Sequence, residues 1–369
     1  MNPSIQFCPN LDCFDRGQDE GSNIGIHSHE EKRYICHRCG KTFAARTGTI
    51  FYRRRYADKF ISEMVSLLGH GCPPQAIVAT YKVDERTLSA WDQASGEHCH
   101  KVHDVFIPKG QLDLGQVQAD ELRVKIQAGI LWLASAIAVS TRLWLGGVVS
   151  QSRDKHLVLA LAQIVKNCAL FRPLLICFDG FKAYISAFQR AFRTPLADGR
   201  VGRPPLIAWP NIALGRVVKR YAKSLVAAVD RELVQGSSAL AQSLLLSSQG
   251  GGVLNTSFVE RLNATFRARL ACLARRTRQL VRKAETLETG IYLTGSVYNF
   301  CCYHKSLRLK LYVTGERESH RWVKRTPAMA AGLTDHCWSV LELLSFKIAP
   351  PPYVPPKRRG RPPKAVSVP

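Results

Sequence analysis

Residues Pro173–Tyr184 have the sequence PLLICFDGFKAY, and this stretch decides the fold class. Its apolar run, Leu174–Phe178, is typical of a strand that is buried on both faces of a sheet. Asp179 and Gly180 end the run, and a helix is predicted from Phe181 onward. Because open α/β proteins bind ligands at the carboxyl ends of such strands, Asp179 is a candidate site residue. The alternative is that Asp179 caps the helix that follows it.

The composition indicates a folded chain with a polyanionic partner. The 369 residues are 46% hydrophobic and suffice for two or three domains of about 150 residues each. Lys and Arg number 52 against 28 Asp and Glu, a formal charge of +24 that favours nucleic acid over a membrane as partner. Four of the 12 cysteines have metal-ligand spacing, and no secretory signal opens the sequence. We therefore expect a reduced, cytoplasmic protein that associates with the nucleoid.

The first 50 residues are predicted to form a zinc ribbon. Four residues separate Cys8 from Cys13, and two separate Cys36 from Cys39. Two such turns can present four thiolates to one tetrahedral Zn²⁺, a closed site that is structural. The stretch between the two pairs is expected to form a small hairpin. The alternatives are that some of these cysteines are merely buried, or that nearby histidines replace one of them as ligand: His27, His29 and His37.

Residues 51–108 are predicted to form a helix-turn-helix DNA-binding domain. It would contain three short helices, with the third capped by Asp84 and ending near Gly96. Histidines that follow are expected in a linker: His98, His100 and His103. An ordinary helical bundle is the alternative for the three helices. Basic residues interleaved with aromatic ones suit a surface that grips a phosphate backbone, although a solvated charged face has the same pattern. The candidate DNA contacts are Arg53, Arg54, Arg55 and Arg86.

The third predicted domain, residues 109–345, is an α/β domain with a mixed sheet flanked by helices. Three early strands, a helix near 154–168 and the strand that ends at Asp179 give the order βββαβα. The apolar segment 128–150 is predicted to be two of these strands, a β-hairpin, because Arg142 interrupts it where a membrane-spanning helix would be apolar. Three further segments are expected to be a loop insertion, a strand with the start of a helix, and a flexible connection: 193–215, 216–229 and 237–252.

Two further acids join Asp179 as candidates. Asp120 lies within the first strand of this domain, and Glu260 lies in the first turn of a predicted helix, 253–283. Since neighbouring strand residues point to opposite faces, only Asp120 or Glu121 is expected to point into the site, and Asp120 is chosen. The alternative for Glu260 is a capping box with Ser257. Three carboxylates suit two Mg²⁺ or Mn²⁺ ions, which assist phosphoryl transfer.

The chain resembles the DDE transposases of bacterial insertion sequences, closest to the insertion-sequence-one group with an amino-terminal zinc ribbon. The resemblance spans about residues 1–345 and rests on these motifs: CPNLDC with CHRC, KTFAARTGTIF, QADE, FDGFKAY, SFVERLNATFR and YNFCCYHKSL. It implies a ribonuclease-H-like catalytic domain and Mg²⁺-dependent DNA strand transfer. Asp120, Asp179 and Glu260 take the three acid positions, and Asn263 and His304 match motif positions near the active site. Arg267, on nearly the same helical face as Glu260, is a candidate DNA contact.

The carboxyl end, residues 346–369, is predicted to be separate. Prolines form an extended spacer, and the sequence KRRGRPPK after it resembles an AT-hook. Arginines of such a narrow core can enter an A·T-rich minor groove: Arg358, Arg359 and Arg361. A disordered basic tail that binds any polyanion is the alternative.

These features predict a transposase that binds the terminal inverted repeats of an element and joins them to target DNA. Because two ends must be brought together, a homodimer or larger assembly is expected. A non-catalytic DNA-binding regulator derived from such an element is the main alternative, and it predicts binding without cleavage. A ribonuclease or resolvase on the same kind of sheet is another, and it predicts cleavage of RNA hybrids or branched DNA.

Overall fold

A computed structural model describes residues 1–18, 23–196, 202–222, 225–249, 251–277, 279–313 and 319–355. The chain divides into two compact units. One comprises Met1–Arg54 together with Lys347–Pro369, and the other is Arg55–Phe346. The four-segment organisation expected from the sequence stays a prediction.

The first unit contains a short 3₁₀ helix, η1 (Pro3–Ile5), and a three-stranded antiparallel sheet. Its strands follow chain order: β1 (Ile24–Ser28), β2 (Arg33–Cys36) and β3 (Thr42–Ala44). The pairing of β1 with β2 confirms the predicted hairpin between the two cysteine pairs. The buried apolar cluster is small and includes three of the four cysteines: Cys8, Cys13, Ile24, Tyr34, Cys36 and Phe43.

The second unit begins with three helices, α1 (Asp58–Gly69), α2 (Pro74–Tyr81) and α3 (Glu85–Phe106). Asp84 caps α3 as predicted, since its Oδ1 accepts the backbone N–H of Thr87 at 3.0 Å. The predicted end of α3 near Gly96 is wrong, because this glycine serves helix packing. A Cβ atom there would lie 2.4 Å from the carbonyl oxygen of Thr289 on α8 (Ala284–Ser296).

The continuation of α3 also corrects the prediction of a histidine-bearing linker. His98 and His103 are buried on α3. The Nε2–H of His98 donates to the carbonyl oxygen of Leu343 at 3.2 Å, and that of His103 donates to Leu145 at 3.0 Å. These histidines are therefore internal packing residues with backbone partners.

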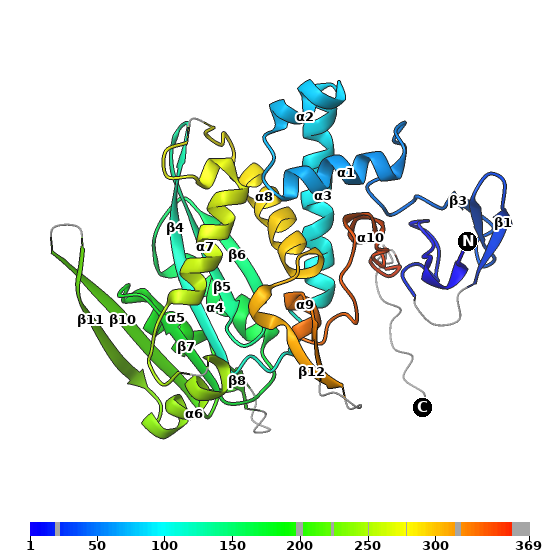
Figure 1. Ribbon diagram of the computed structural model, residues 1–369. Coiled ribbons are helices and arrows are strands. Elements are labelled where there is room, and N and C mark those ends of the chain that lie inside the picture. The colour runs from blue at the N-terminus through cyan, green and yellow to red at the C-terminus, as the bar shows by residue number, and fades with distance from the viewer. Residues whose placement is uncertain are drawn as a thin grey trace, which may run out of the picture. The chain divides into compact units, whose positions relative to one another are not determined.

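A mixed six-stranded sheet forms the centre of the second unit, and this confirms the predicted multidomain α/β class (Figure 1). The strand order is β11-β10-β7-β4-β5-β6. β7 is parallel to β4 and β10, and the other neighbours are antiparallel. The strands are β4 (Gln116–Ile126), β5 (Gly129–Ala138), β6 (Trp144–Ser150), β7 (Leu174–Phe178), β10 (Ile212–Ala222) and β11 (Leu225–Gln235).

Helices cover both faces of this sheet. Odd-numbered residues of β4, including Val117 and Ala119, pack with α4 (Lys155–Cys168) and α5 (Ala183–Ala191). Even-numbered residues, including Leu122 and Val124, pack with α7 (Ser257–Arg269) and α8 on the other face. In Figure 1, α7 and α8 lie in front of the strands. This alternation sends neighbouring β4 side chains to different helical layers.

The hairpin of β5 and β6 confirms the prediction for the apolar segment around Arg142. This residue has a φ of 58° in the turn between the two strands. Among the described helices, none combines the length and the apolar character needed to cross a bilayer.

Several predicted segments have a different structure. The described residues of segment 216–229 contain no helix start, because they belong to the antiparallel strands β10 and β11. The expected flexible connection contains α6 (Ser238–Gln249), whose Ala241 and Leu245 pack against β7 and β10. The predicted helix 253–283 is shorter, since α7 ends at Arg269 and a 3₁₀ helix, η2 (Ala271–Leu273), follows. Described parts of the expected loop insertion include two short paired strands, β8 (Arg193–Pro195) and β9 (Leu206–Ala208).

The remaining elements of the second unit follow α8. They are the π-helix η3 (Val297–Cys301), the 3₁₀ helix η4 (Lys305–Leu307), the paired strands β12 (Leu309–Val313) and β13 (Ser319–Val323), and helices α9 (Pro327–Ala330) and α10 (Val340–Ser345). Asn299 of η3 joins this part to the sheet. Its side chain accepts the N–H of Trp144 and donates to the carbonyl oxygen of the same residue, both at 2.9 Å.

Candidate functional site: an acidic pocket at the sheet edge and a four-cysteine cluster

Two of the predicted acids meet at one edge of the sheet. The parallel pairing of β4 with β7 ends at Ala119 and Phe178. Asp120 and Asp179 directly follow these two residues, so the topology places them next to each other. Carboxylate oxygens of Asp120, Glu121 and Asp179 all lie within 4.8 Å of one another. The sheet edge therefore carries a concentrated negative charge.

Asp120 is the acid of this group that faces α7. Its Oδ2 accepts a hydrogen bond from Nδ2 of Asn263 at 2.8 Å, and its Oδ1 accepts the N–H of Glu121 at 2.9 Å. Burial, followed by the charges of Glu121 and Asp179, raises the pKa of Asp120 to about 7. The Oδ1 of Asn263 is buried and has no hydrogen-bond partner within the described residues. An orphaned acceptor beside an acidic group suits a metal-bound water as its donor.

Asp179 lies in the turn between β7 and α5 and does not occupy the N-cap position of the helix. Its Oδ1 accepts the backbone N–H of Phe181 at 2.9 Å, whereas α5 starts two residues later with no side-chain cap at Lys182. Asp179 thus stabilises the turn before the helix rather than the helix itself. Its Oδ2 lies 3.6 Å from Nη2 of Arg153, and its side chain is 37% exposed. A carboxylate oxygen therefore stays accessible at the sheet edge.

Glu121, the alternative to Asp120 that was not chosen from the sequence, is the third acid of this group. Its carboxylate is 2% exposed and is held by Arg153, whose Nε donates at 2.5 Å, and by the hydroxyl of Tyr184 at 2.8 Å. Burial, and then the charge of Asp179, raises the pKa of Glu121, while these two hydrogen bonds oppose the shift.

The expectation that Asp120 and Glu121 point to opposite faces, with Asp120 directed into the site, agrees with the pocket lining, which includes Asp120 and not Glu121. Alternation holds, since Asp120 contacts α7 and Glu121 contacts α5. Carboxylate oxygens of both residues nevertheless lie within 4.8 Å of Asp179, because β7 ends at Phe178, whereas β5 continues to pair with β4 on its other side. The QADE sequence places two acids directly after Ala119, the last β4 residue that pairs with β7.

Glu260 lies in the same pocket but outside the 4.8 Å group. A pocket of about 360 Å³ is lined by all three predicted acids and by Lys219 of β10. The Oε1 of Glu260 accepts from Nζ of Lys219 at 2.5 Å and from the hydroxyl of Thr256 at 2.6 Å. The alternative of a capping box is not formed, because Thr256 occupies the N-cap position and the hydroxyl of Ser257 bonds to Asn255.

The donor set fits Mg²⁺ or Mn²⁺. Ligand oxygens about 2.1 Å from one octahedral Mg²⁺ lie about 3–4 Å from one another, close to the spacing of the group here. Asp120 and Asp179 have oxygens available, whereas Glu121 is already neutralised by Arg153. Mg²⁺ keeps several waters and uses few protein carboxylates, so two or three suffice.

The four predicted cysteines form a second cluster, in the first unit. The Sγ atoms of Cys8 and Cys39 are 3.7 Å apart, and those of Cys13 and Cys36 are 3.8 Å apart. Sulfurs bound tetrahedrally at about 2.3 Å from Zn²⁺ lie about 3.8 Å apart, so the group fits this ion closely. The neighbouring histidines are not members of the group that the described residues form.

The predicted DNA contacts lie on separate elements. Arg53 is exposed with a φ of 59°, and Arg54 belongs with it to the first unit, whereas Arg55 starts the second. Arg86 is exposed in the first turn of α3, and Arg267 lies on α7 near Asp120. The predicted tail contacts, Arg358, Arg359 and Arg361, lie outside the described residues.

Comparison of the chain with protein-family models and with curated proteins found no match. The geometry of the acidic pocket and of the cysteine cluster is therefore the basis for the functional argument.

Proposed function

We propose that this protein is a DDE-type transposase that cuts and joins DNA with the help of divalent metal ions. The observation that carries the proposal is the convergence of Asp120, Asp179 and Glu260 on one pocket. These acids come from a strand, the end of a neighbouring strand and a helix that covers the sheet. In this proposal the α/β domain is ribonuclease-H-like, and the resemblance of the sequence motifs supports the same class.

Asp120 and Asp179 would hold the metal, with Glu260 as a third ligand once it leaves Lys219. Bound Mg²⁺ would neutralise charge on the phosphate and activate the attacking oxygen. Among the chain's own groups, Arg267 and Lys219 supply positive charge for the DNA backbone beside the acids. Arg153 and Tyr184 hold the carboxylate of Glu121 by hydrogen bonds.

Two phosphoryl transfers constitute the proposed reaction. In the first, a water oxygen attacks a phosphorus at the element end, the bond from phosphorus to the 3′-oxygen breaks, and a free 3′-hydroxyl results. In the second, that 3′-oxygen attacks a phosphorus of the target, loses its proton to solvent, and displaces a new 3′-hydroxyl. The first step hydrolyses a phosphodiester bond and the second exchanges one phosphodiester bond for another. Neither step therefore requires an oxidant or a nucleotide cofactor.

The other parts of the chain have roles in this proposal. Zn²⁺ at Cys8, Cys13, Cys36 and Cys39 would stabilise a zinc ribbon. Helices α1–α3, with a turn in which Lys82 has a φ of 54°, would act as a helix-turn-helix unit on the terminal repeats. A homodimer or larger assembly on nucleoid DNA would hold the two ends.

The test is strand cleavage of duplexes taken from the DNA that flanks the gene. Purified protein with Mg²⁺ is expected to release a 3′-hydroxyl at the element end, and Asp179→Asn is expected to abolish release. Asp113→Asn is the matched control, because Asp113 pairs with Arg172 away from the pocket. Equal cleavage by Asp179→Asn and the wild type refutes the proposal, and cleavage restricted to RNA hybrids or branched DNA indicates a nuclease instead.

The ion pair between Lys219 and Glu260 favours one second candidate, a DNA-binding regulator that no longer cuts. In that case Lys219 permanently occupies the carboxylate that a metal needs. This candidate predicts sequence-specific binding of the flanking repeats and no cleavage with Mg²⁺ or Mn²⁺.

A further inference from the structure

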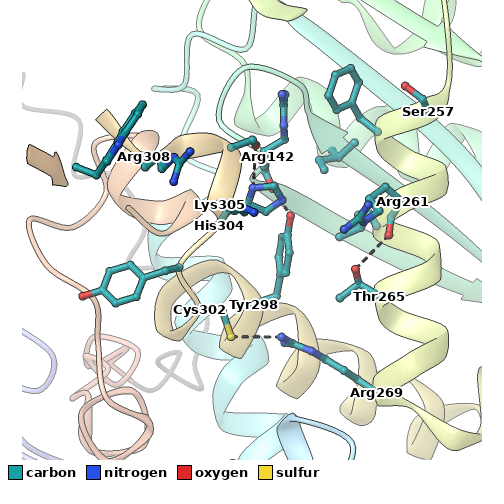
Figure 2. A pocket seen from close by; sticks show the side chains of 16 residues that line it. Arg142, Ser257, Arg261, Thr265, Arg269, Tyr298, Cys302, His304, Lys305 and Arg308 are labelled. Carbon is teal, nitrogen blue, oxygen red and sulfur yellow. Dashed lines mark hydrogen bonds between the residues drawn. The ribbon is translucent and has the colours of Figure 1, made fainter. Parts of the chain in front are cut away.

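A second and larger pocket lies beside α7 and contains none of the acids. Its volume is about 1070 Å³, and it is enclosed by α7, the β5–β6 turn, and the segment from η3 to β13. Figure 2 shows Arg261, Thr265 and Arg269 projecting from α7 toward Tyr298 and His304. Much of its lining comes from the SFVERLNATFR and YNFCCYHKSL motifs, although Asp120, Asp179 and Glu260 are not part of it.

The lining of this basic pocket is strongly cationic. It contains five cationic side chains and His304, and among the described lining residues there is no Asp or Glu. The five cations are Arg142, Arg261, Arg269, Lys305 and Arg308. Their mutual repulsion is unfavourable in the free protein, and an anion in the pocket relieves it.

Arg142 is held in a position that suits the binding of an anion. Its backbone has the left-handed φ of 58°, and Tyr298 fixes it by donating its hydroxyl to the Arg142 carbonyl oxygen at 3.1 Å. The guanidinium stacks on Phe258, with its Cζ 4.0 Å from the ring centre. Its Nη1 is buried without a hydrogen-bond acceptor in the described part of the chain. A buried donor without a partner is costly, so an incoming phosphate oxygen is favoured there.

Aromatic side chains share the pocket with these cations. Tyr303 is 54% exposed and Trp322 is 43% exposed, although large aromatic surfaces are normally covered. The guanidinium of Arg308 lies over the Trp322 ring at 4.1 Å. Exposed aromatic rings next to arginines are the arrangement on which proteins stack unpaired bases.

Helical geometry explains why the two pockets lie on opposite flanks of α7. At about 100° per residue, Val259, Leu262 and Phe266 form the stripe that packs on the sheet. Glu260, Asn263 and Arg267 follow on one side of this stripe and face the acidic pocket. Arg261, Thr265 and Arg269 follow on the other side and line the basic pocket.

We propose that the basic pocket binds an unpaired nucleotide of a nucleic-acid strand, with a phosphate near Arg142 and Arg261 and a base against the exposed rings. This inference goes beyond the proposed transposition chemistry, because binding needs no metal and no reaction. A volume near 1,000 Å³ is at the upper end of the range for pockets that enclose small ligands. A nucleotide can enter such a space, whereas a paired duplex, about 20 Å wide, meets only its rim.

The test compares the affinities of four fluorescent octamers for the full-length protein without divalent metal: oligo-dT, an abasic strand of equal charge, oligo-U and a G·C duplex, which offers the AT-hook-like tail no A·T minor groove. Oligo-dT is expected to bind at least tenfold more tightly than the duplex. Arg261→Ala with Arg308→Ala is expected to weaken oligo-dT binding at least tenfold and to reduce the salt slope by about 1.4, from about 0.7 per lost phosphate contact. The matched control is Lys101→Ala with Arg190→Ala, two exposed cations outside the lining.

Trp322→Ala tests the base contact. It is expected to weaken oligo-dT about fivefold or more, as the loss of one stacked base implies, and to leave the abasic strand unchanged. Oligo-U decides between RNA and DNA: equal binding identifies any unpaired strand, and weaker binding identifies DNA.

A local measurement keeps the result independent of other basic parts of the chain. Cys302 lines the pocket, and although burial opposes it, hydrogen bonds from His70 and Arg269 lower the pKa of its thiol. Oligo-dT is expected to slow its alkylation, measured by peptide mass spectrometry. The proposal is overturned if the control pair weakens binding as much as the lining pair, if duplex and oligo-dT bind equally, or if alkylation of Cys302 is unaffected. Asp179→Asn is expected to retain full oligo-dT binding, so this result is separable from the failure of catalysis.

Discussion

Replacing Lys219 by methionine is expected to strengthen the binding of a divalent metal at the acidic pocket. Lys219 holds Oε1 of Glu260, and the glutamate must leave it to become a ligand. The two side chains are 30% and 45% exposed, which places the pair among solvated ion pairs. Such pairs contribute about 0.2–1 kcal/mol, so their removal should tighten metal binding by about 1.4-fold to fivefold.

The assay is isothermal titration with Mn²⁺ at fixed ionic strength. Arg220→Met is the matched control, because Arg220 lies on the same strand and pairs with Asp230 rather than with Glu260. Both variants remove one positive charge, so a difference between them isolates the release of Glu260. The gain is expected to disappear when Lys219→Met is combined with Glu260→Gln, since no carboxylate is then released.

Two results refute this reasoning. If Lys219→Met and Arg220→Met tighten Mn²⁺ binding equally, general electrostatics explains the effect and Glu260 is not a ligand. If the gain persists in the Glu260→Gln background, the metal site consists of the aspartates alone.

Four other predictions concern pH, zinc and stability. Burial raises the pKa of Asp120 to about 7, so Mn²⁺ must displace a proton from it at low pH. The affinity for Mn²⁺ should therefore increase about tenfold between about pH 6 and pH 8. Asp120→Asn should lose this pH dependence. The stability of the metal-free protein should change with pH in the opposite direction. The stabilising effect of the raised pKa is present below the ordinary pKa of Asp and is lost as the pH rises through about 7, which thermal melts would detect. Cys36→Ser should lose the bound zinc measured by a colorimetric assay, whereas Cys272→Ser should keep it. Asn299→Leu leaves the N–H and C=O of Trp144 without their side-chain partner, at about 1–3 kcal/mol each, which a lower urea midpoint would show.

The sheet could be predicted because its strands carry strong local signals. Leu174–Phe178 is a continuous apolar run, and the arginine at the centre of segment 128–150 marks a turn. Both signals arise within a few residues and do not depend on distant contacts. The positions of Asp120 and Asp179 then follow from strand pairing, because residues after paired strand ends share one edge of the sheet.

Features that depend on tertiary contacts were not predictable from local patterns. The Ser- and Gly-rich composition of 237–252 predicts a flexible connection, but α6 is stabilised by packing of Leu245 and Ala241 on the sheet. Gly96 suggested a helix end, yet it permits the close approach of α8. The partners of Glu121 come from α5 and from the segment before α4, and no local pattern connects them.

The exposed back of α7 provides a last prediction that links the two pockets. Between the acidic and basic stripes the helix presents Ala264 and Ala268, both exposed and small enough to leave room for a strand. A strand that occupies both pockets must cross here, so Ala264→Glu is expected to weaken binding of a dT 12-mer about fivefold. This follows from about 1 kcal/mol of repulsion between solvated charges about 4 Å apart.

A dT trimer, which can fill only the basic pocket, should bind Ala264→Glu and the wild type alike. Ala160→Glu is the matched control, an exposed alanine on α4, which packs on the opposite face of the sheet. If Ala264→Glu weakens the trimer and the 12-mer equally, or if Ala160→Glu has the same effect as Ala264→Glu, the strand does not cross α7. The arginines on the two flanks of this helix would then bind separate nucleic-acid segments.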